Sequence, residues 1–224
     1  MTQPHDTTPD VIDLLTGIQP GDRLDAIRRH RLQARTHAQQ SHLALFEPAH
    51  VLPGSRFTLA DRQAVAAFVA GLHQQPDATA FYNAVLASEG ARQARPGVPQ
   101  AIAAEVVRGA ASGPYGNYPP GPLSEEDQAG PAYAVGEAHG AVLGKPLSAA
   151  LEHAHLLTLH PRDASPAALQ KLLDAGWGTT DIVTLSQLVA FLAFQIRVVA
   201  GLRALAAAPA PRGQATLSNE ETQA

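Results

Sequence analysis

The amino-acid sequence predicts an all-α fold of roughly eight helices. Apolar residues recur at helical spacing through most of the chain, and helix-capping patterns precede several of these runs. A half-buried β-strand would instead need apolar residues at every second position, and no run alternates in this way over a useful length. The sequence therefore contains no convincing strand.

The N-terminal part of the chain predicts two helices. Thr8 is the expected cap of the first, with Pro9 at its first helical position. After a break at residues 17–21, Asp22 is expected to cap the second. This second helix is predicted to be long, polar and continuous to about Phe46.

The stretch from Ala60 to Tyr82 predicts two antiparallel helices. Thr58, with Asp61 three residues later, resembles a capping box in front of it. Apolar residues then recur on one helical face, at Val65, Phe68, Val69 and Leu72. A turn at residues 74–76 is expected to bring the next helix back against the first. A further helix is predicted to begin at Pro99.

A loop is predicted in the middle of the chain, because residues 111–127 hold four prolines and three glycines. Ser124 and Asp127 are expected to cap a new helix after it, with Pro131 as a second possible first-turn residue. A stop is predicted at residues 144–146, and apolar residues at helical spacing follow it.

The last predicted helix, Ile182 to Leu205, is the most apolar segment. The helix before it begins at Ser165 and ends with Gly176 as a left-handed C-cap, with Trp177 packing behind. Because the last helix is apolar around most of its circumference, we expect it in the centre of the fold or at a subunit interface. Interrupting glutamine and arginine side chains argue against a membrane span.

Composition narrows the class of protein. The chain has 224 residues, 45% of them hydrophobic, and a formal net charge of −4, which allows a sizeable core and disfavours nucleic-acid and anionic-membrane partners. It has no cysteine, which excludes disulfides, zinc–thiolate sites and thiol nucleophiles. The polar N-terminus lacks the pattern of a signal or transit peptide. We expect a cytoplasmic protein with an arm carrying a short helix, a helical domain and a disordered tail, at residues 1–20, 21–206 and 207–224.

The segment from Leu156 to Leu202 resembles the C-terminal half of peroxidase-related proteins in the alkylhydroperoxidase D and carboxymuconolactone decarboxylase family. The residues that carry the resemblance are Leu157-Thr158, Pro161, Ala175-Gly176, Asp181-Ile182-Val183, Phe191, Phe194 and Arg197. The similarity covers about residues 40–205. It implies an alkylhydroperoxidase D-like fold with two related helical halves, assembled as a dimer, trimer or hexamer.

The family's peroxidase motif is absent from the corresponding stretch. That motif is a Glu, a Cys-x-x-Cys pair twelve residues later and a His four residues past the second Cys, and its chemistry requires a thiolate nucleophile and a resolving thiol. When Arg62 is aligned on the family's Arg, Gln63 takes the place of the Glu, Gln75 and Ala78 replace the two Cys, and Tyr82 replaces the His. If the chain is an enzyme, we expect no dithiol-dependent peroxidase activity.

The same stretch could still hold acid–base chemistry, because family members that decarboxylate a lactone acid do not depend on a Cys pair. His73 and Tyr82 are the candidate catalytic residues, predicted to face one pocket, and Gln63, Gln75 and Arg62 are candidate substrate-binding residues. The alternative is that His73 interacts with the helix dipole and Tyr82 belongs to the core. No cofactor is expected.

Two other patterns are weaker. His153, His155 and His160 cluster in "EHAHLLTLH", but positions 153 and 155 point about 200° apart on a helix, so capping and interface roles are expected rather than a metal site. Arg28, Arg31 and Arg35 share a helical face, which is more typical of a solvated face or of intersubunit ion pairs than of phosphate binding.

Three functions stay open on the sequence. The first is binding or acid–base transformation of a small organic acid or lactone-like compound. The second is a non-catalytic partner subunit of an active relative, and the third is a peroxidase that works without thiols. We also expect a homo-oligomer, because the last helix offers more apolar surface than one partner helix covers. The Tyr115–Pro122 loop is the expected arm toward a neighbour.

Overall fold

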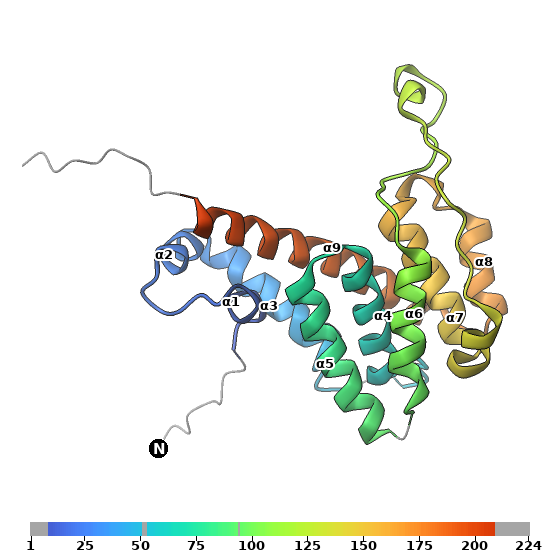
Figure 1. Ribbon diagram of the computed structural model, residues 1–224, viewed down its shortest axis with the longest axis horizontal. Coiled ribbons are helices and arrows are strands. Elements are labelled where there is room, and N and C mark those ends of the chain that lie inside the picture. The colour runs from blue at the N-terminus through green and yellow to red at the C-terminus, as the bar shows by residue number, and fades with distance from the viewer. Residues whose placement is uncertain (1–8, 51–52, 94, 209–224) are drawn as a thin grey trace, which may run out of the picture.

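The computed structural model describes residues 9–50, 53–93 and 95–208 (Figure 1). This part of the chain is all-α and forms no strand, only an isolated bridge between Gly116 and Gln128. Nine α-helices are present within it: α1 (Val11–Thr16), α2 (Arg23–Arg29), α3 (Leu32–Phe46), α4 (Leu59–Leu72), α5 (Pro76–Arg92), α6 (Gly97–Gly109), α7 (Glu137–Leu159), α8 (Pro166–Asp174) and α9 (Thr179–Ala207). Two short 3-10 helices, η1 (Pro122–Glu126) and η2 (Pro161–Asp163), lie in the connections.

Helix α4 is the centre of the main core. It packs against α5, α6, α7 and α9, and each residue from Ala64 to Ala70 is completely buried. Most of these side chains are small, which lets the neighbouring helices approach closely. At Gly71 an added Cβ would lie 2.5 Å from Val106 on α6, so this position requires glycine at the present helix spacing.

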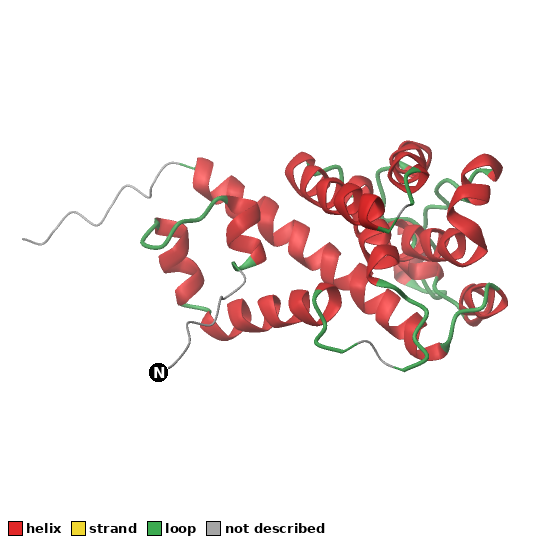
Figure 2. Ribbon diagram, turned by 90° about the horizontal axis from the view of Figure 1, so that it is seen from below, coloured by secondary structure: helices red, strands yellow, loops and turns green. Residues whose placement is uncertain are grey.

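Helix α9 extends from the main core to a second, smaller one. Its first half packs against α4, α7 and α8, and its later part packs against α1 and α3 (Figures 1 and 2). The second core consists of Val11, Ile12, Leu15, Ala38 and Val199. Of the two expected places for this helix, the centre of the fold or a subunit interface, the first describes the side of α9 that contributes to both cores. The helix ends at Ala207.

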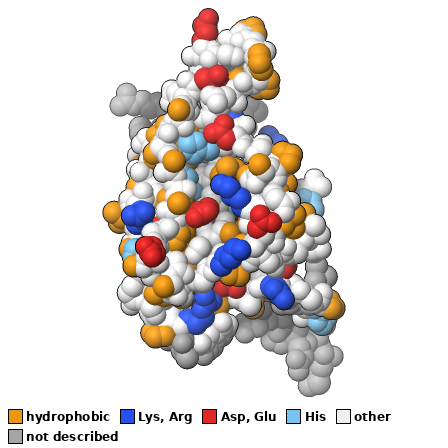
Figure 3. Space-filling model, turned by 90° about the vertical axis from the view of Figure 1, so that its right-hand side faces the viewer, with side chains coloured by type: hydrophobic (Ala, Val, Ile, Leu, Met, Phe, Trp, Pro, Cys, Tyr) orange, Lys and Arg blue, Asp and Glu red, His pale blue; other side chains and the backbone are white. Residues whose placement is uncertain are grey.

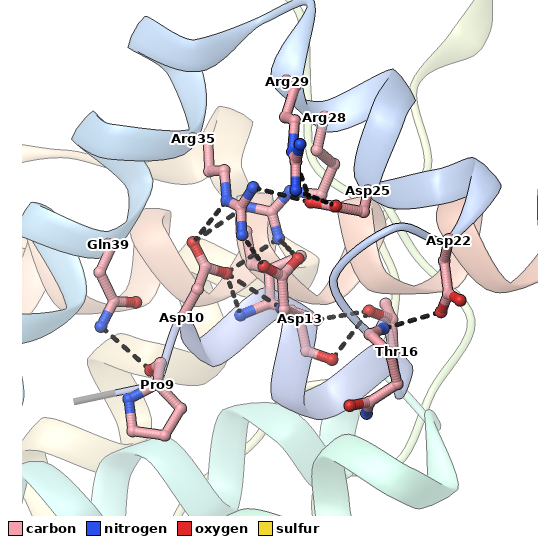
Figure 4. Close-up of polar contacts among 12 residues, drawn as sticks. Pro9, Asp10, Asp13, Thr16, Asp22, Asp25, Arg28, Arg29, Arg35 and Gln39 are labelled. Atoms are coloured by element: carbon pink, nitrogen blue, oxygen red, sulfur yellow. Dashed lines mark hydrogen bonds and ion pairs between the residues drawn. The ribbon is translucent and has the colours of Figure 1, made fainter. Parts of the chain in front are cut away.

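The single helix predicted from Asp22 to Phe46 is wrong, because the chain bends at Arg31, between α2 and α3. The bend lets arginines on both helices converge on the start of α1 (Figure 4). Buried Arg28 forms ion pairs with Asp10 and Asp13, and Arg35 pairs with Asp13 and Asp25. The sequence predicts a solvated or intersubunit arginine face, but Arg28 and Arg35 instead bind carboxylates of their own chain.

Several predicted helix ends are confirmed. The Thr58 side chain accepts a hydrogen bond from the Asp61 amide, and that of Ser165 accepts one from the Ala168 amide. Gly176 has φ +93°, and buried Trp177 donates its amide proton back to Leu172 O. The predicted stop in the 144–146 region is a kink inside α7, where Gly144 has φ 78° and ψ 160°.

Three predicted helix starts differ from the structure. Asp10, not Thr8, caps α1 by accepting from the amides of Ile12 and Asp13; Thr8 lies outside the described residues. Helix α6 begins at Gly97 rather than Pro99. After the loop, α7 begins only at Glu137, because Ser124 and Asp127 bind loop backbone instead: Ser124 Oγ accepts from the Gly121 amide and Asp127 Oδ1 from the Tyr118 amide.

Candidate functional site

Tyr82, the first candidate catalytic residue, lies in the core. Its side chain is 1% exposed. The Tyr82 ring packs against the rings of Phe46 and Phe81, with 5.8 and 5.0 Å between ring centroids. The hydroxyl donates to Gln195 Oε1 on α9 at 2.5 Å. Burial raises the pKa of this phenol well above its usual value, although the hydrogen bond to Gln195 opposes the rise. Tyr82 is therefore a packed, un-ionised side chain.

His73 and the two glutamines are spread over different environments. His73 is the C-cap of α4 and is half-buried, and burial lowers its pKa to about 4, with a smaller contribution from Arg197. Gln63 is half-buried and Gln75 is exposed. Four cavities in the described part of the chain have linings that contain neither these three residues nor Tyr82. The shared pocket of His73 and Tyr82 stays a prediction.

Arg62, the remaining candidate, connects α4 to the end of α3. Its guanidinium donates to Leu45 O at 2.8 Å and to Phe57 O at 3.3 Å, and it lies 5.3 Å from the centre of the Phe57 ring. The side chain is 6% exposed, and burial lowers its pKa. Two of its donors are thus used by carbonyl groups of the fold.

The richest group of titratable side chains lies elsewhere, around a cavity of about 240 Å³ between α7, α8 and residues 131–133. Its titratable lining residues are Tyr133, Glu152, His153, His155, His160, Asp163 and Lys171. Figure 3 faces this side of the molecule and shows histidine side chains below the protruding loop, with charges of both signs nearby. Four of these seven groups, at positions 152, 153, 155 and 160, come from the last turns of α7 and the residue that caps it.

His155 is held as a neutral ring. It is 3% exposed, and its Nε2–H donates to Gly109 O at 3.1 Å, which leaves the lone pair on Nδ1. Burial lowers its pKa, the Gly109 contact opposes this, and the nearby His160 lowers it further. Its ring stacks on Tyr133 with 4.4 Å between centroids and 17° between planes. A neutral imidazole in a fixed orientation has the properties of a general base.

His160 stands next to it, at the end of α7, with 5.8 Å between the two ring centroids. Its Nδ1 lies 3.2 Å from Asp163 Oδ2, and its Nε2 lies 3.1 Å from Pro131 O. Both neighbours are acceptors, so the ring donates both hydrogen bonds together only when both nitrogens carry a proton. The sequence predicts a capping or interface role for this histidine, and His160 is the C-cap of α7.

Glu105 does not line the cavity but binds Tyr133, which does. This fully buried carboxylate on α6 accepts from the Tyr133 hydroxyl at 2.8 Å, from His139 Nδ1 at 2.5 Å and from the Gly136 amide at 3.0 Å. Burial opposes its ionisation, but the hydrogen bonds from His139, Tyr133 and Gly136 outweigh burial and lower its pKa. For Tyr133, burial and then the Glu105 carboxylate raise the pKa, so the phenol stays protonated. The carboxylate thereby fixes the ring that stacks on His155.

Lys171 and His153 are two further polar residues in the wall of the cavity. Lys171, exposed on α8, is the single Lys or Arg among the lining residues. His153 is 6% exposed and has a pKa lowered by burial; its Nε2 lies 3.4 Å from Ser186 Oγ, and its buried Nδ1 has no hydrogen-bond partner in the described structure. No group of three or more His, Asp or Glu side chains in the described residues has the arrangement of a metal site.

The spacing of the three histidines is visible in the sequence, but spacing alone does not indicate a cavity. Because positions 153 and 155 point about 200° apart on a helix, a shared metal ion is not expected from the sequence, and both residues nevertheless line one cavity. Tyr133, Lys171 and Glu105 come from a loop and two other helices, so no local spacing indicates them.

Comparisons of the chain with protein-family models, with curated proteins and with solved structures give no match in any of the three. The function therefore has to be argued from the cavity itself.

Proposed function

We propose that the chain binds a small organic acid in the cavity between α7 and α8 and transfers a proton to or from it. The observation that carries this proposal is the neutral, stacked His155 beside the doubly hydrogen-bonded His160. Two neighbouring imidazoles can take a proton from a bound ligand and return one to it. Lys171 supplies the positive charge that a carboxylate needs.

The size of the cavity favours a small compound. At about 240 Å³ it lies below the range of roughly 300–1,000 Å³ that is usual for drug-sized ligands. Its lining is mixed, with apolar Ala149, Leu156 and Ala168 beside the titratable groups. This combination suits a short carboxylic acid, or a lactone that keeps a free carboxylate.

The proposal fits an alkylhydroperoxidase D-like fold that has lost its redox thiols. In support, the segments that carry the resemblance coincide with element ends: residues 175–176 close α8, and residues 181–183 lie in the first turns of α9. The packed surroundings of Tyr82 support the absence of peroxidase chemistry at the position of the missing motif. The two-halves architecture and the family membership remain part of the proposal.

Binding is tested with a panel of short carboxylic acids and their methyl esters, followed by calorimetry. We expect an acid to bind, its ester to bind at least tenfold more weakly, and Lys171→Met to reduce affinity for the acid while Lys171→Arg retains most of it. Lys145→Met is the matched control, because Lys145 lies at the α7 kink and binds Asp174 O instead of lining the cavity. Equal binding by the Lys171→Met and wild-type proteins would contradict the assigned charge.

Proton transfer is tested separately, by following exchange of carbon-bound hydrogen in the bound acid with deuterated water by NMR. His155→Gln should remove exchange and leave binding of the acid within about threefold, because glutamine can still donate to Gly109 O. If acids bind and no exchange occurs in the wild-type protein, the second hypothesis, a non-catalytic binding or partner subunit, is favoured.

A further inference from the structure

One face of α9 is unpartnered along five turns. Its exposed residues follow one another at intervals of four and three: Val183, Gln187, Ala190, Phe194, Arg197 and Gly201. Two of them are large and apolar, with Val183 55% and Phe194 48% exposed. The opposite side of the helix, with Leu185, Leu188 and Leu192, is completely buried. An alternating four–three spacing is the pattern of a seam that packs against another helix. We call these six residues the α9 seam.

A groove runs beside the α9 seam. It has a volume of about 540 Å³, and its walls are Ser41, Ala44 and Leu45 from α3 and Gln187, Ala190 and Phe194 from α9. The groove and the seam therefore form one continuous surface over two neighbouring helices. Three of the seam residues belong to both features, so an occupant of one would also contact the other.

We propose that a second copy of this chain packs on this surface, with the two α9 helices antiparallel about a two-fold axis near residue 192. In this register each large apolar seam residue meets a small one. Ala190 lies opposite Phe194 of the second copy, and Val183 lies opposite Gly201 of the second copy. The Phe194 ring of each copy then enters the groove of the other. An isologous contact requires such self-complementarity.

Charge selects the antiparallel arrangement. The α9 seam contains no Asp, Glu or Lys, and Arg197 is its single charged residue. In a parallel pair Arg197 would face its own symmetry mate. In the antiparallel pair Arg197 lies opposite Gln187, a hydrogen-bond acceptor, and the two arginines are ten residues apart along the axis, about 15 Å. A charge-poor contact with Phe and Arg is typical of interface cores.

The available area suits a dimer. The seam spans about 27 Å along the helix axis, and α3 and α9 together present a surface roughly 20 Å wide. The flat area is thus roughly 500 Å² per copy, and the corrugated accessible surface is larger. A standard stable interface takes about 800 Å² from each partner. The α9 helix alone would fall well short of this area, which is why the α3 wall belongs to the contact.

A lipid bilayer is the other occupant to consider, because α9 is long and apolar enough to span one. Half of its most apolar window is already buried in the protein, and Arg203 near its end donates to Leu15 O at 2.6 Å. A spanning α9 would have to give up these contacts and also bury Arg197 and Gln187. The second copy is therefore favoured, and the bilayer becomes an outcome of the test.

The absence of cysteine makes the register directly testable by disulfide trapping. Gln187→Cys and Arg197→Cys proteins, carrying tags of different mass, are mixed while reduced and then oxidised with diamide. We expect the mixed disulfide to form in large excess over either self-pair, because each residue faces the other type across the axis. Val107→Cys, 77% exposed on α6, is the control and should not be trapped. Preferential self-pairing of each variant would overturn the antiparallel arrangement.

Light scattering on a size-exclusion peak tests the assembly itself. The wild-type protein should have twice the 23.4 kDa mass of one chain. Phe194→Asp should reduce it to one chain while circular dichroism stays unchanged, and Val107→Asp should leave the dimer intact. A wild-type mass of one chain at micromolar concentration would overturn the proposal. So would flotation of the wild-type protein with neutral phosphatidylcholine vesicles that is abolished by Phe194→Asp, since the seam would then bind lipid.

Discussion

His42 is a buried histidine on the side of α3 that faces α9, and its side chain is 7% exposed. Its ring lies 5.0 Å from the Phe46 ring and 6.2 Å from the Phe191 ring, measured between centroids. Its Nδ1 is buried without a hydrogen-bond partner in the described structure. Burial lowers its pKa to about 4, and the Asp10 carboxylate only partly opposes the shift. The fold therefore accepts this ring only in its neutral form.

Stability should consequently fall in mild acid. Between the unfolded pKa of 6.5 and the folded pKa of about 4, the unfolded chain binds a proton at His42 that the folded chain does not, so unfolding becomes easier as pH falls through this window. His42 therefore lowers the free energy of unfolding by roughly 3 kcal/mol at pH 4 and below, and this penalty is absent above pH 6.5. Urea unfolding at pH 7 and pH 4.5 should show a smaller loss for His42→Leu than for the wild-type protein.

Exposed His37 provides the control for this experiment. It contacts Gln40 on the surface of the same helix, so His37→Gln should leave the pH dependence unchanged. Because half-buried His73 also has a lowered pKa, part of the acid sensitivity should survive in His42→Leu. Identical pH dependence in His42→Leu and the wild-type protein would contradict the assignment.

Residue by residue, the sequence predicted what is local. Thr58 and Ser165 were recognisable as caps because the side chain and the amide it binds are three residues apart. Tyr82 and Gln195 are 113 residues apart, and Glu105 and Tyr133 are 28 apart, so no spacing rule could pair them. The sequence therefore points to residues 62–82 as the candidate site, where Tyr82 is buried, and gives His153, His155 and His160 no more than capping and interface roles, although they line one cavity.

Helix α7 is kinked, and the kink depends on the backbone conformation of one residue, Gly144. Gly144 has φ 78° and ψ 160° inside a segment that is otherwise helical, and Pro146 follows. This conformation is essentially restricted to glycine. The kink directs the second part of α7, and with it the histidines of the cavity. The sequence indicated the stop, but only the packing of both parts against neighbouring helices determines the direction of the chain after it.

Two alanine substitutions in α7 should have opposite effects. Gly144→Ala should lower the free energy of unfolding by about 1–3 kcal/mol, because the backbone angle is strained although the nearest atom to the new Cβ is 3.9 Å away. Gly140→Ala, in the same helix, should raise it by about 0.5–1 kcal/mol, because the new Cβ meets only ordinary contacts at 3.8 Å or more. Urea titrations measure both. A Gly144→Ala protein as stable as Gly140→Ala would show that the kink does not need this angle.

For the whole molecule, α9 is the element shared by two cores, and the ion-pair cluster of Figure 4 holds the smaller one in place. Arg28 binds Asp10 and Asp13 at the start of α1, next to the apolar contacts of α1 with Val199. Burial, and then the neighbouring Asp10, raise the pKa of Asp13, while Arg28 and Arg35 oppose the rise. Two carboxylates so close together require a cation between them.

Removing that cation should open the small core and leave the large one closed. Arg28→Met leaves Asp10 and Asp13 incompletely neutralised, which typically costs about 3–5 kcal/mol for a buried pair. Because none of the helices α4–α8 contributes a side chain to these Arg28 and Arg35 ion pairs, the loss should appear as local opening. Hydrogen exchange followed by mass spectrometry should rise sharply in α1–α3 and in the last turns of α9, with α4 still protected. Arg23→Met, at an exposed position on α2, should change none of these rates. Faster exchange in α4 to the same extent as in α1 would instead mean that both cores unfold as one unit, with α9 coupling them rigidly.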